Sequence, residues 1–511
     1  MSSITERPRK RLTPKQRREL LRASRRQRTQ QPSVSRRRKR RLSRAQRRAY
    51  RDQLARKARL SRRQLKQICH QLPRPIHDVL GSLEPAFTRP TYRRFVLLVL
   101  AAILTTGAHT IANMLRCLGP LAPGDPSSYH RFFSRDRWSS WALARRLAGM
   151  VFAYFVAKGT IELAVDDTVT EHPGPEVYGK GCHRDPVRST HSFTAFRWGH
   201  KWVALVVLVK VPWARRRWAL PLLLALYRPK GKARRHKTPV QWAQQMLRVL
   251  MRWFPDRRFT CTGDGAYGSH AFASFAACHR RQLTLVSGFS ANANLVSPPP
   301  PYSGHGRPRV KGDDLPSPAA VVRDTANRRR TEVDWYGGGQ RCVEVVSGSG
   351  CWFQSGKGLV PVSWVFVHDV TGTHRDQYFF TTDQEMSPEA VIAAYTHRWN
   401  IETTFEELRA FIGLETTRGW SRATVLRAEP CLFGLYTIVV LLYAGLPAPW
   451  RRVRAVDWPG KRDVTFSDAI TAVRRWLWLA WVFGTPSRRG ALRKLGGVLR
   501  PILLNALAPA A

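Results

Sequence analysis

Two long apolar runs lie close together in the middle of the chain, and they restrict the possible folds more than any other feature. They read WGHKWVALVVLVKV and WALPLLLALYRP, at residues 198–211 and 218–229. Apolar runs of this kind, bounded by polar and turn-forming residues, are typical of buried strands. We therefore expect two adjacent strands of a sheet that is buried in the core.

The segments around these runs alternate between strand-like and helix-like patterns. The predicted order is strand, strand, strand, helix, strand, helix, strand. Residues 258–269 carry both a strand and the start of the helix that follows it. The segments are 159–170, 198–211, 218–229, 238–254, 258–269 and 283–289. A sequence of elements that mixes strands and helices in this way predicts an α/β fold, with a mixed sheet that is flanked by helices. We assign this core to residues 158–289 and 386–446.

The remaining segments differ from the core in composition. Residues 290–385 contain runs of Pro and Gly and short aromatic strands, which indicate a β-rich insertion. Residues 75–157 have helical periodicity, and either a helix-turn-helix or a pair of core helices explains them. Residues 447–511 form a basic C-terminal region. The apolar run 431–446 is shorter than the roughly 20 residues that a membrane span needs, so we expect a buried helix.

The chain is strongly basic, with 86 Lys and Arg residues against 34 Asp and Glu and a formal net charge of +52. Such an imbalance is typical of proteins that bind a polyanion, and nucleic acid is the commonest one. Residues 1–70 hold 27 of the basic residues and 3 acids. We expect a disordered DNA-binding arm, of which 43–70 can form a basic helix on DNA; a solvated tail is the alternative.

The cysteines and the N-terminus bear on where the protein works. None of the 8 cysteines forms a C-x-x-C pair, so a zinc ribbon is not expected, and their low number fits a reducing cytosol. No apolar stretch follows the first basic residues, so we do not expect a signal peptide.

Carboxylates follow two of the predicted strands, and another lies on a late helix. Asp166 and Asp167 end the first strand, Asp264 ends a later one in TGDGAYGS, and Glu402 lies in the helix. Strand ends of an α/β sheet meet at its carboxyl edge, where binding sites form. Carboxylate oxygens are the ligands that Mg²⁺ prefers, and two such ions can activate a water for phosphodiester cleavage.

The helix predicted at AYTHRWNIETTFEELR, residues 394–409, has an unusual face. Tyr395, Arg398, Glu402 and Arg409 stand at offsets 0, 3, 7 and 14, which a helix brings within about 60° of one another. A stripe with this spacing is usually apolar. We expect the tyrosine and arginines to hold DNA phosphates beside Glu402. A salt bridge between Arg398 and Glu402 is the simpler alternative.

These motifs resemble those of DDE transposases of the bacterial insertion-sequence type, which have a ribonuclease-H-like catalytic core. The resemblance rests on VDDT, TGDGAYGS and the pattern Y-x2-R-x3-E-x6-R, in which Arg409 replaces the usual lysine. It implies metal-dependent DNA strand cleavage and strand transfer. It also implies two Mg²⁺ ions, with Mn²⁺ as a substitute, bound by Asp167, Asp264 and Glu402, with Asp166 as the alternative to Asp167.

The same resemblance extends to residues 177–192 and 199–202, which are similar to a loop near the first acid. The candidate site neighbours there are His183, Asp185, His191, His200 and Lys201, and of these His200 and Lys201 are the expected DNA contacts. The resemblance further implies double-stranded DNA as the partner, a homodimer when DNA is bound, and a cytoplasmic, nucleoid-associated bacterial protein. Two alternatives stay open: a nuclease of the same fold without strand transfer, and a basic nucleic-acid-binding protein without catalysis.

Overall fold

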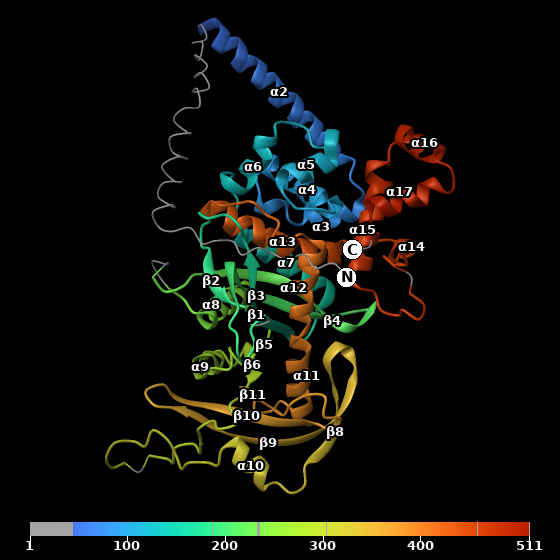
Figure 1. The fold of residues 1–511 in the computed structure, drawn as a ribbon. Coiled ribbons are helices and arrows are strands. Elements are labelled where there is room, and N and C mark those ends of the chain that lie inside the picture. The colour runs from blue at the N-terminus through green and yellow to red at the C-terminus, as the bar shows by residue number, and fades with distance from the viewer. Residues whose placement is uncertain (1–43, 186–187, 232–235, 303, 457, 510–511) are drawn as a thin grey trace, which may run out of the picture. The chain divides into compact units, whose positions relative to one another are not determined.

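The computed structural model describes residues 44–185, 188–231, 236–302, 304–456 and 458–509, and Figure 1 shows their fold. The predicted disordered arm lies outside the described residues as far as residue 43. Residues 44–70 form a helix, α2 (Arg44–His70). This agrees with the expectation that residues 43–70 can form a basic helix.

The core is a mixed sheet with the strand order β4-β3-β1-β5-β6. β3 runs antiparallel to both β1 and β4, whereas β1, β5 and β6 are parallel. This arrangement is ribonuclease-H-like and confirms the predicted fold class. The core strands and the short edge strand β2 are β1 (Ile161–Glu171), β2 (Gly181–Arg184), β3 (Phe196–Val211), β4 (Ala214–Tyr227), β5 (Phe259–Gly263) and β6 (Leu283–Gly288).

Both faces of the central strands are covered, which explains the unbroken apolar runs in the sequence. Every residue from Trp202 to Val209 of β3 is buried. Strands covered on both faces need apolar side chains at successive positions and not only at alternate ones. The helices that pack on β3 and β4 are α7 (Ser140–Phe155), α8 (Pro239–Trp253), α12 (Asn400–Phe411) and α13 (Arg422–Ala444).

The insertion between β6 and α11 continues the core sheet. β11 pairs antiparallel with β6, and β10 and β9 follow it, so that one sheet of 11 strands spans core and insertion. This agrees with the prediction of a β-rich segment, but no local pattern in the sequence indicated that its strands would continue the core sheet. The elements after β5 are α9 (His270–Cys278), β7 (Leu295–Val296), α10 (Pro318–Asp324), β8 (Arg329–Asp334), β9 (Gln340–Gln354), β10 (Gly358–Asp369) and β11 (Gln377–Thr381).

The segment before β1 is helical, as predicted. Residues 95–104 of α4 are all buried, which favours a core helix over a recognition helix that must reach DNA. Helix α5 begins at a Thr110 cap, whose side chain accepts a hydrogen bond from the Asn113 N–H. The helices are α3 (Arg74–Gly81), α4 (Arg89–Leu104), α5 (Ile111–Leu118), α6 (Pro126–Ser134) and α7.

The C-terminal helices begin with α13, which contains the predicted buried helix. Among the described residues, α13 is the helix that by length and composition is apolar enough to cross a membrane, yet 67% of its apolar window is buried inside the protein. A core helix has the same composition. The later helices are α14 (Ala448–Arg451), α15 (Phe466–Leu477), α16 (Pro486–Lys494) and α17 (Leu499–Leu507).

The predicted late helix is divided in two. Ser387 caps α11 (Pro388–Arg398) by accepting a hydrogen bond from the Ala390 N–H. Trp399 then separates α11 from α12, although its backbone angles remain helical. The break lies between Arg398 and Glu402 and was not predicted from their common helical face.

Candidate active site

Asp166 and Asp167 point to opposite faces of β1, because side chains alternate along a strand. Asp166 receives a hydrogen bond from Arg398 Nη1 at 2.8 Å. Asp167 forms an ion pair with Lys201 Nζ of β3, also at 2.8 Å. The two neighbouring acids therefore have different partners, and the face of Asp166 is the one on which α11 and α12 lie.

Arg398 links the strand acid to the helix acid. Its Nη1 atom donates to Asp166 Oδ2 and, at 3.2 Å, to Glu402 Oε1. The arginine is only 6% exposed, so the guanidinium is a buried counter-charge that both carboxylates share. The simple salt bridge between Arg398 and Glu402 is thus present, but it is one part of a larger cluster.

The carboxylates of this cluster influence one another. Burial raises the pKa of Asp166 to about 7; Arg398 opposes this shift and the charge of Asp264 adds to it. Burial also raises the pKa of Asp167, with Lys201 opposing and Asp264 adding. The pKa of Glu402 is raised by burial as well, against the effect of Arg398 and with a contribution from Asp264. Four acids from three distant parts of the chain, β1, the turn after β5 and α12, therefore share one electrostatic environment.

The donor set suits a hard divalent cation, although the side chains are not yet gathered around one. Among the described residues, no three His, Cys, Asp or Glu side chains are placed to hold a single metal ion. The raised pKa values of Asp166, Asp167 and Glu402 show that Arg398 and Lys201 do not fully compensate the buried negative charge. Carboxylate oxygens in this situation fit Mg²⁺ or Mn²⁺.

The polar face around Arg398 points at the sheet and not outward. Arg409 donates from Nη2 to Thr168 Oγ1 at 2.6 Å and to the Val169 carbonyl oxygen at 3.2 Å. Tyr395 stacks on Phe379 of β11, with ring centroids 4.0 Å apart. These contacts place the face against the end of β1 and the end of the insertion, so Arg398 and Arg409 already have protein partners.

His200 does not have the predicted role in this structure. Its side chain is 0% exposed, with Nδ1 3.2 Å from Glu429 Oε1 and Nε2 3.0 Å from the Tyr178 carbonyl oxygen. A direct contact with DNA is excluded in this arrangement, because the imidazole is enclosed by protein. Lys201, the next residue, lies on the other face of β3 with Asp167 and stays partly exposed.

Glu429 is an important residue that the sequence analysis missed. It also accepts hydrogen bonds from Thr170 Oγ1 at 3.0 Å and from Trp202 Nε1. One signal in the sequence could have identified it, because Glu429 is an isolated acid within the largely apolar segment 422–444. A carboxylate is buried in such a segment only when it has hydrogen-bond or charged partners. This carboxylate joins α13 to both β1 and β3, directly beyond the candidate catalytic acids.

The other candidate neighbours do not join the acid cluster. Asp185 is buried and forms an ion pair with Arg197 at 2.8 Å, and that arginine also contacts Glu171 at 3.0 Å. His183 is buried on β2, and His191 is exposed in the loop that follows. These contacts stabilise the hairpin of β2 and β3.

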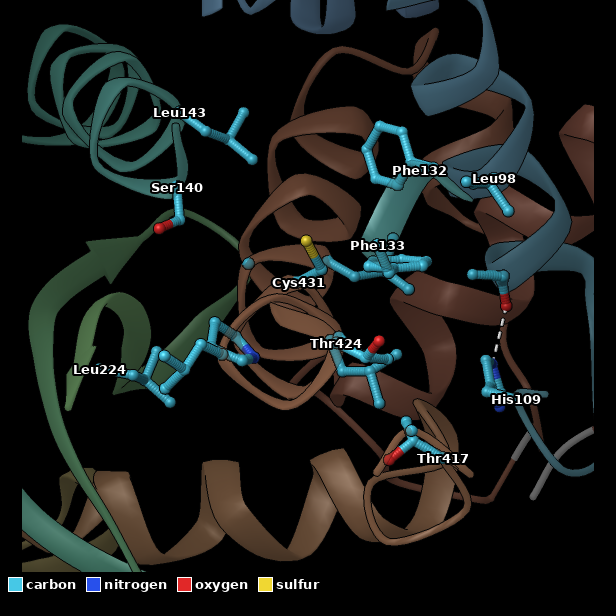
Figure 2. Close-up of a pocket in the computed structure, with 18 of the residues that line it drawn as sticks. Leu98, His109, Phe132, Phe133, Ser140, Leu143, Leu224, Thr417, Thr424 and Cys431 are labelled. Carbon is cyan, nitrogen blue, oxygen red and sulfur yellow. Dashed lines mark hydrogen bonds between the residues drawn. The ribbon is translucent and has the colours of Figure 1, made fainter. Parts of the chain in front are cut away.

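A large apolar cavity lies away from the acids. Its volume is about 790 Å³, and Figure 2 shows its lining from the N-terminal helices, β4 and α13. His109 at one end is neutral near pH 7, because burial lowers its pKa to about 4. None of the four acids lines this cavity, so it is not the candidate active site.

Two family models match parts of this chain. A family model described as "DDE superfamily endonuclease" matches residues 82–341, and one described as "Archaeal putative transposase ISC1217" matches residues 326–442. The first match covers half of the 511 residues. The chain therefore belongs to the DDE superfamily endonucleases. With the second match, it is a DDE transposase, an enzyme that cuts DNA and transfers its strands. Proteins of this type generally use divalent metals.

Among solved structures, the cryo-EM structure of a piggyBac transposase synaptic complex with hairpin DNA is similar. The similarity covers 87% of this chain and 83% of that chain, with 10% sequence identity and a TM-score of 0.37. No curated protein matches this sequence.

Proposed function

We propose that Asp166, Asp264 and Glu402 bind two Mg²⁺ ions, for which Mn²⁺ can substitute, and that the protein acts on double-stranded DNA as a homodimer. Asp166 is preferred to Asp167, the first expectation, because Asp166 lies on the face of β1 that carries Arg398 and Glu402. The observation that carries this proposal is the cluster of acids around the buried Arg398 guanidinium. When bound, the ions would activate a water and stabilise the leaving oxygen of a phosphodiester. The ligand set takes one acid from β1, one from the turn after β5 and one from α12.

The neighbouring bases have a second role in this proposal. Lys201 and Arg398 compensate the charge of the acids through ion pairs with Asp167 and Asp166. A bound cation would supply part of that positive charge, and the two basic side chains would then contact DNA phosphates. Arginine is well suited to this exchange, because its planar donors match two phosphate oxygens. Among the described residues, Arg398 Nε has no hydrogen-bond partner that would have to be replaced.

Asp167 has a different role in the proposal. It forms an ion pair with Lys201 on the face of β1 opposite to Asp166, and it thereby holds this lysine beside the site. The alternative is that Asp167 takes the place of Asp166 as a ligand. Comparing D166N with D167N distinguishes the two: only the change at a ligand should abolish Mn²⁺ binding.

The first test is nicking of supercoiled plasmid by the purified protein in Mg²⁺, comparing wild type with E402Q. The variant keeps the side-chain shape but removes the charge of a proposed ligand. We expect nicking to fall by roughly a hundredfold or more while DNA binding persists. The matched control is E406Q, since Glu406 lies one turn further along α12 and is exposed.

Each outcome of this test has a clear meaning. Loss of nicking in E402Q but not in E406Q supports the metal site, and strand-transfer assays then separate a transposase from a nuclease. Equal nicking by wild type and E402Q would remove Glu402 from the site. Metal-independent behaviour of all three proteins, with tight DNA binding, would favour the alternative of a binding protein without catalysis.

A further inference from the structure

The hairpin of β2 and β3 carries aromatic side chains on its outer surface. Phe196 is 63% exposed and Trp198 is 58% exposed. Arg184 pairs with Phe196 in the ladder and Cys182 pairs with Trp198, so these four side chains share one face of the hairpin. Cys182 and Arg184 are exposed as well. We call the surface of these four residues the aromatic face.

The opposite face of the hairpin is polar, which reverses the usual arrangement. His183 and Asp185 are buried there. Arg197, on the same face, forms ion pairs with Asp185 at 2.8 Å and with Glu171 at 3.0 Å. Large apolar side chains normally lie inward, and a group of them left on the surface indicates a binding site. The hairpin therefore presents its aromatic face to a partner.

A hollow of about 560 Å³ lies beside Trp198. Its lining, which includes one lysine and one glutamate, is formed by Pro175, Glu176, Val177, Tyr178, Lys180 and Trp198. The guanidinium groups of Arg228 and Arg422 lie over the ring of Tyr178, at 5.0 and 5.9 Å from its centroid. Basic groups thus outnumber the one acid around this hollow, and aromatic rings form part of its wall.

The aromatic face lies on the same side of the sheet as Asp166. Alternate residues of β3 from Phe196 to Ala204 share one face, and Ala204 pairs with Asp166 of β1. His200 on this face is buried under α13, so the exposed part begins at Trp198. The six residues between Trp198 and Ala204 span about 20 Å of extended strand. Stacked bases of one DNA strand advance by about 3.4 Å each, so a strand bound at the acids can reach Trp198 within about six nucleotides.

We propose that the aromatic face binds a single-stranded segment of DNA, with Trp198 and Phe196 stacking on unpaired bases and Arg184 and Lys180 contacting the phosphates. This inference rests on DNA as the partner in the proposed function, and not on the metal ligands. Aromatic rings stack on any base, and neighbouring basic groups follow the backbone. The bases of a duplex are covered by their neighbours, so only unpaired bases can take up these rings. Two copies of a chain with a net charge of +52 repel each other, which favours DNA over a second copy as the occupant.

The test is fluorescence anisotropy of the full-length protein with two labelled probes, an oligo(dT) strand and a duplex of equal length. For W198L and for F196L we expect the affinity for oligo(dT) to fall about tenfold or more, the usual effect of removing one stacking ring. The affinity for the duplex should stay unchanged, because the basic residues remain. W198F keeps a ring and should retain most of the affinity for oligo(dT). The matched control is W458L, which removes another exposed tryptophan, between α14 and α15, and should bind both probes like wild type.

The two probes separate failure of this inference from failure of the proposed function. If W198L and F196L bind oligo(dT) like wild type, the aromatic face has no such role, while loss of nicking in E402Q still supports the proposed function. A wild-type protein that binds neither probe would contradict the proposed function itself. Equal losses for both probes would show a general DNA contact, and equal losses in W198L and W198F would show that stacking is not involved; either result overturns the inference.

Two further measurements test other roles of the same residues. A lower unfolding temperature of both W198L and F196L would show that the rings serve the packing of the hairpin. A change in oligomeric state of W198L, measured by light scattering, would show that the aromatic face is a contact between copies of the chain. We expect neither change, and each of them would replace the DNA role proposed for this face.

Discussion

At the scale of single residues, the adjacent acids Asp166 and Asp167 show how a strand gives two identical side chains different surroundings. One contacts Arg398 and the other Lys201. Burial acts on both, but the pKa of Asp166 reaches about 7. At neutral pH a part of the protein population therefore keeps a proton on Asp166 when no cation is bound. Proton loss and cation binding are then linked at this site.

This linkage predicts a pH-dependent stability. The pKa of Asp166 is raised from 3.8 to about 7 in the folded protein. Between these values the folded state keeps a proton that the unfolded state has lost, so stability falls as the pH rises through this window. The total fall is at most about 4 kcal/mol. We expect the unfolding temperature of D166N, relative to wild type, to rise from pH 5 to pH 8 in metal-free buffer.

The control for this prediction is D256N, which changes an exposed acid. It should show no such trend with pH. Adding Mg²⁺ should stabilise the wild type more at pH 8 than at pH 5, because the cation replaces the proton. A difference between D166N and wild type that does not change with pH would contradict the raised pKa.

At the scale of elements, the buried Glu429 fastens α13 to the strands that carry the candidate site. It contacts His200 and Trp202 of β3 and Thr170 of β1. Because β1 also carries Asp166 and Asp167, the position of this strand end depends on a carboxylate in a helix far along the chain. The segment around Tyr178 joins the same cluster through its carbonyl oxygen.

We expect E429Q to destabilise the protein by about 1–3 kcal/mol, the usual cost of leaving a buried hydrogen-bonding group without a partner. The carboxylate of Glu429 contacts His200, Thr170 and Trp202, whereas the amide has one acceptor oxygen and turns an NH₂ group toward the remaining partners. The measurement is the denaturation midpoint by circular dichroism. The control E385Q, at an exposed position, should leave the midpoint unchanged. Equal midpoints for all three proteins would show that the buried cluster contributes little.

At the scale of the whole molecule, the charge determines how the protein meets DNA. The formal net charge is +52 after all acids of the chain are counted, so basic residues are in large excess over the chain as a whole. Each phosphate contact made by Lys or Arg releases a counterion, so affinity depends steeply on salt. The basic residues are concentrated at the N-terminus, where residues 1–70 hold 27 of the 86.

We therefore expect non-specific DNA affinity to fall by about a thousandfold or more between 50 and 200 mM salt. A variant without residues 1–43 should show a shallower dependence of log affinity on log salt, because fewer counterions are released. Fluorescence anisotropy with a labelled duplex measures both slopes. Equal slopes for the two proteins would show that the N-terminal segment makes no phosphate contacts.

Local patterns in the sequence identified most elements of the core. The apolar runs at 198–211 and 218–229 correspond to β3 and β4, and the helix expected at 238–254 corresponds to α8, which begins with a capping box at Thr238. These predictions succeed because burial and capping act over a few neighbouring residues. The division of the late helix at Trp399 was not predicted. Trp399 keeps helical backbone angles, and the sequence has no Gly or Pro at this position to indicate a break.

The acids themselves could be named from their places after strands and on a helix, but their partners could not. Side-chain type and spacing determined that carboxylates, arginines and a tyrosine would meet at a sheet edge. Only the tertiary structure decided that Arg398 bridges Asp166 and Glu402, that His200 is enclosed by Glu429, and that β11 extends the core sheet. These contacts join segments far apart in the chain, and their geometry depends on strand register and helix packing, which no local pattern encodes.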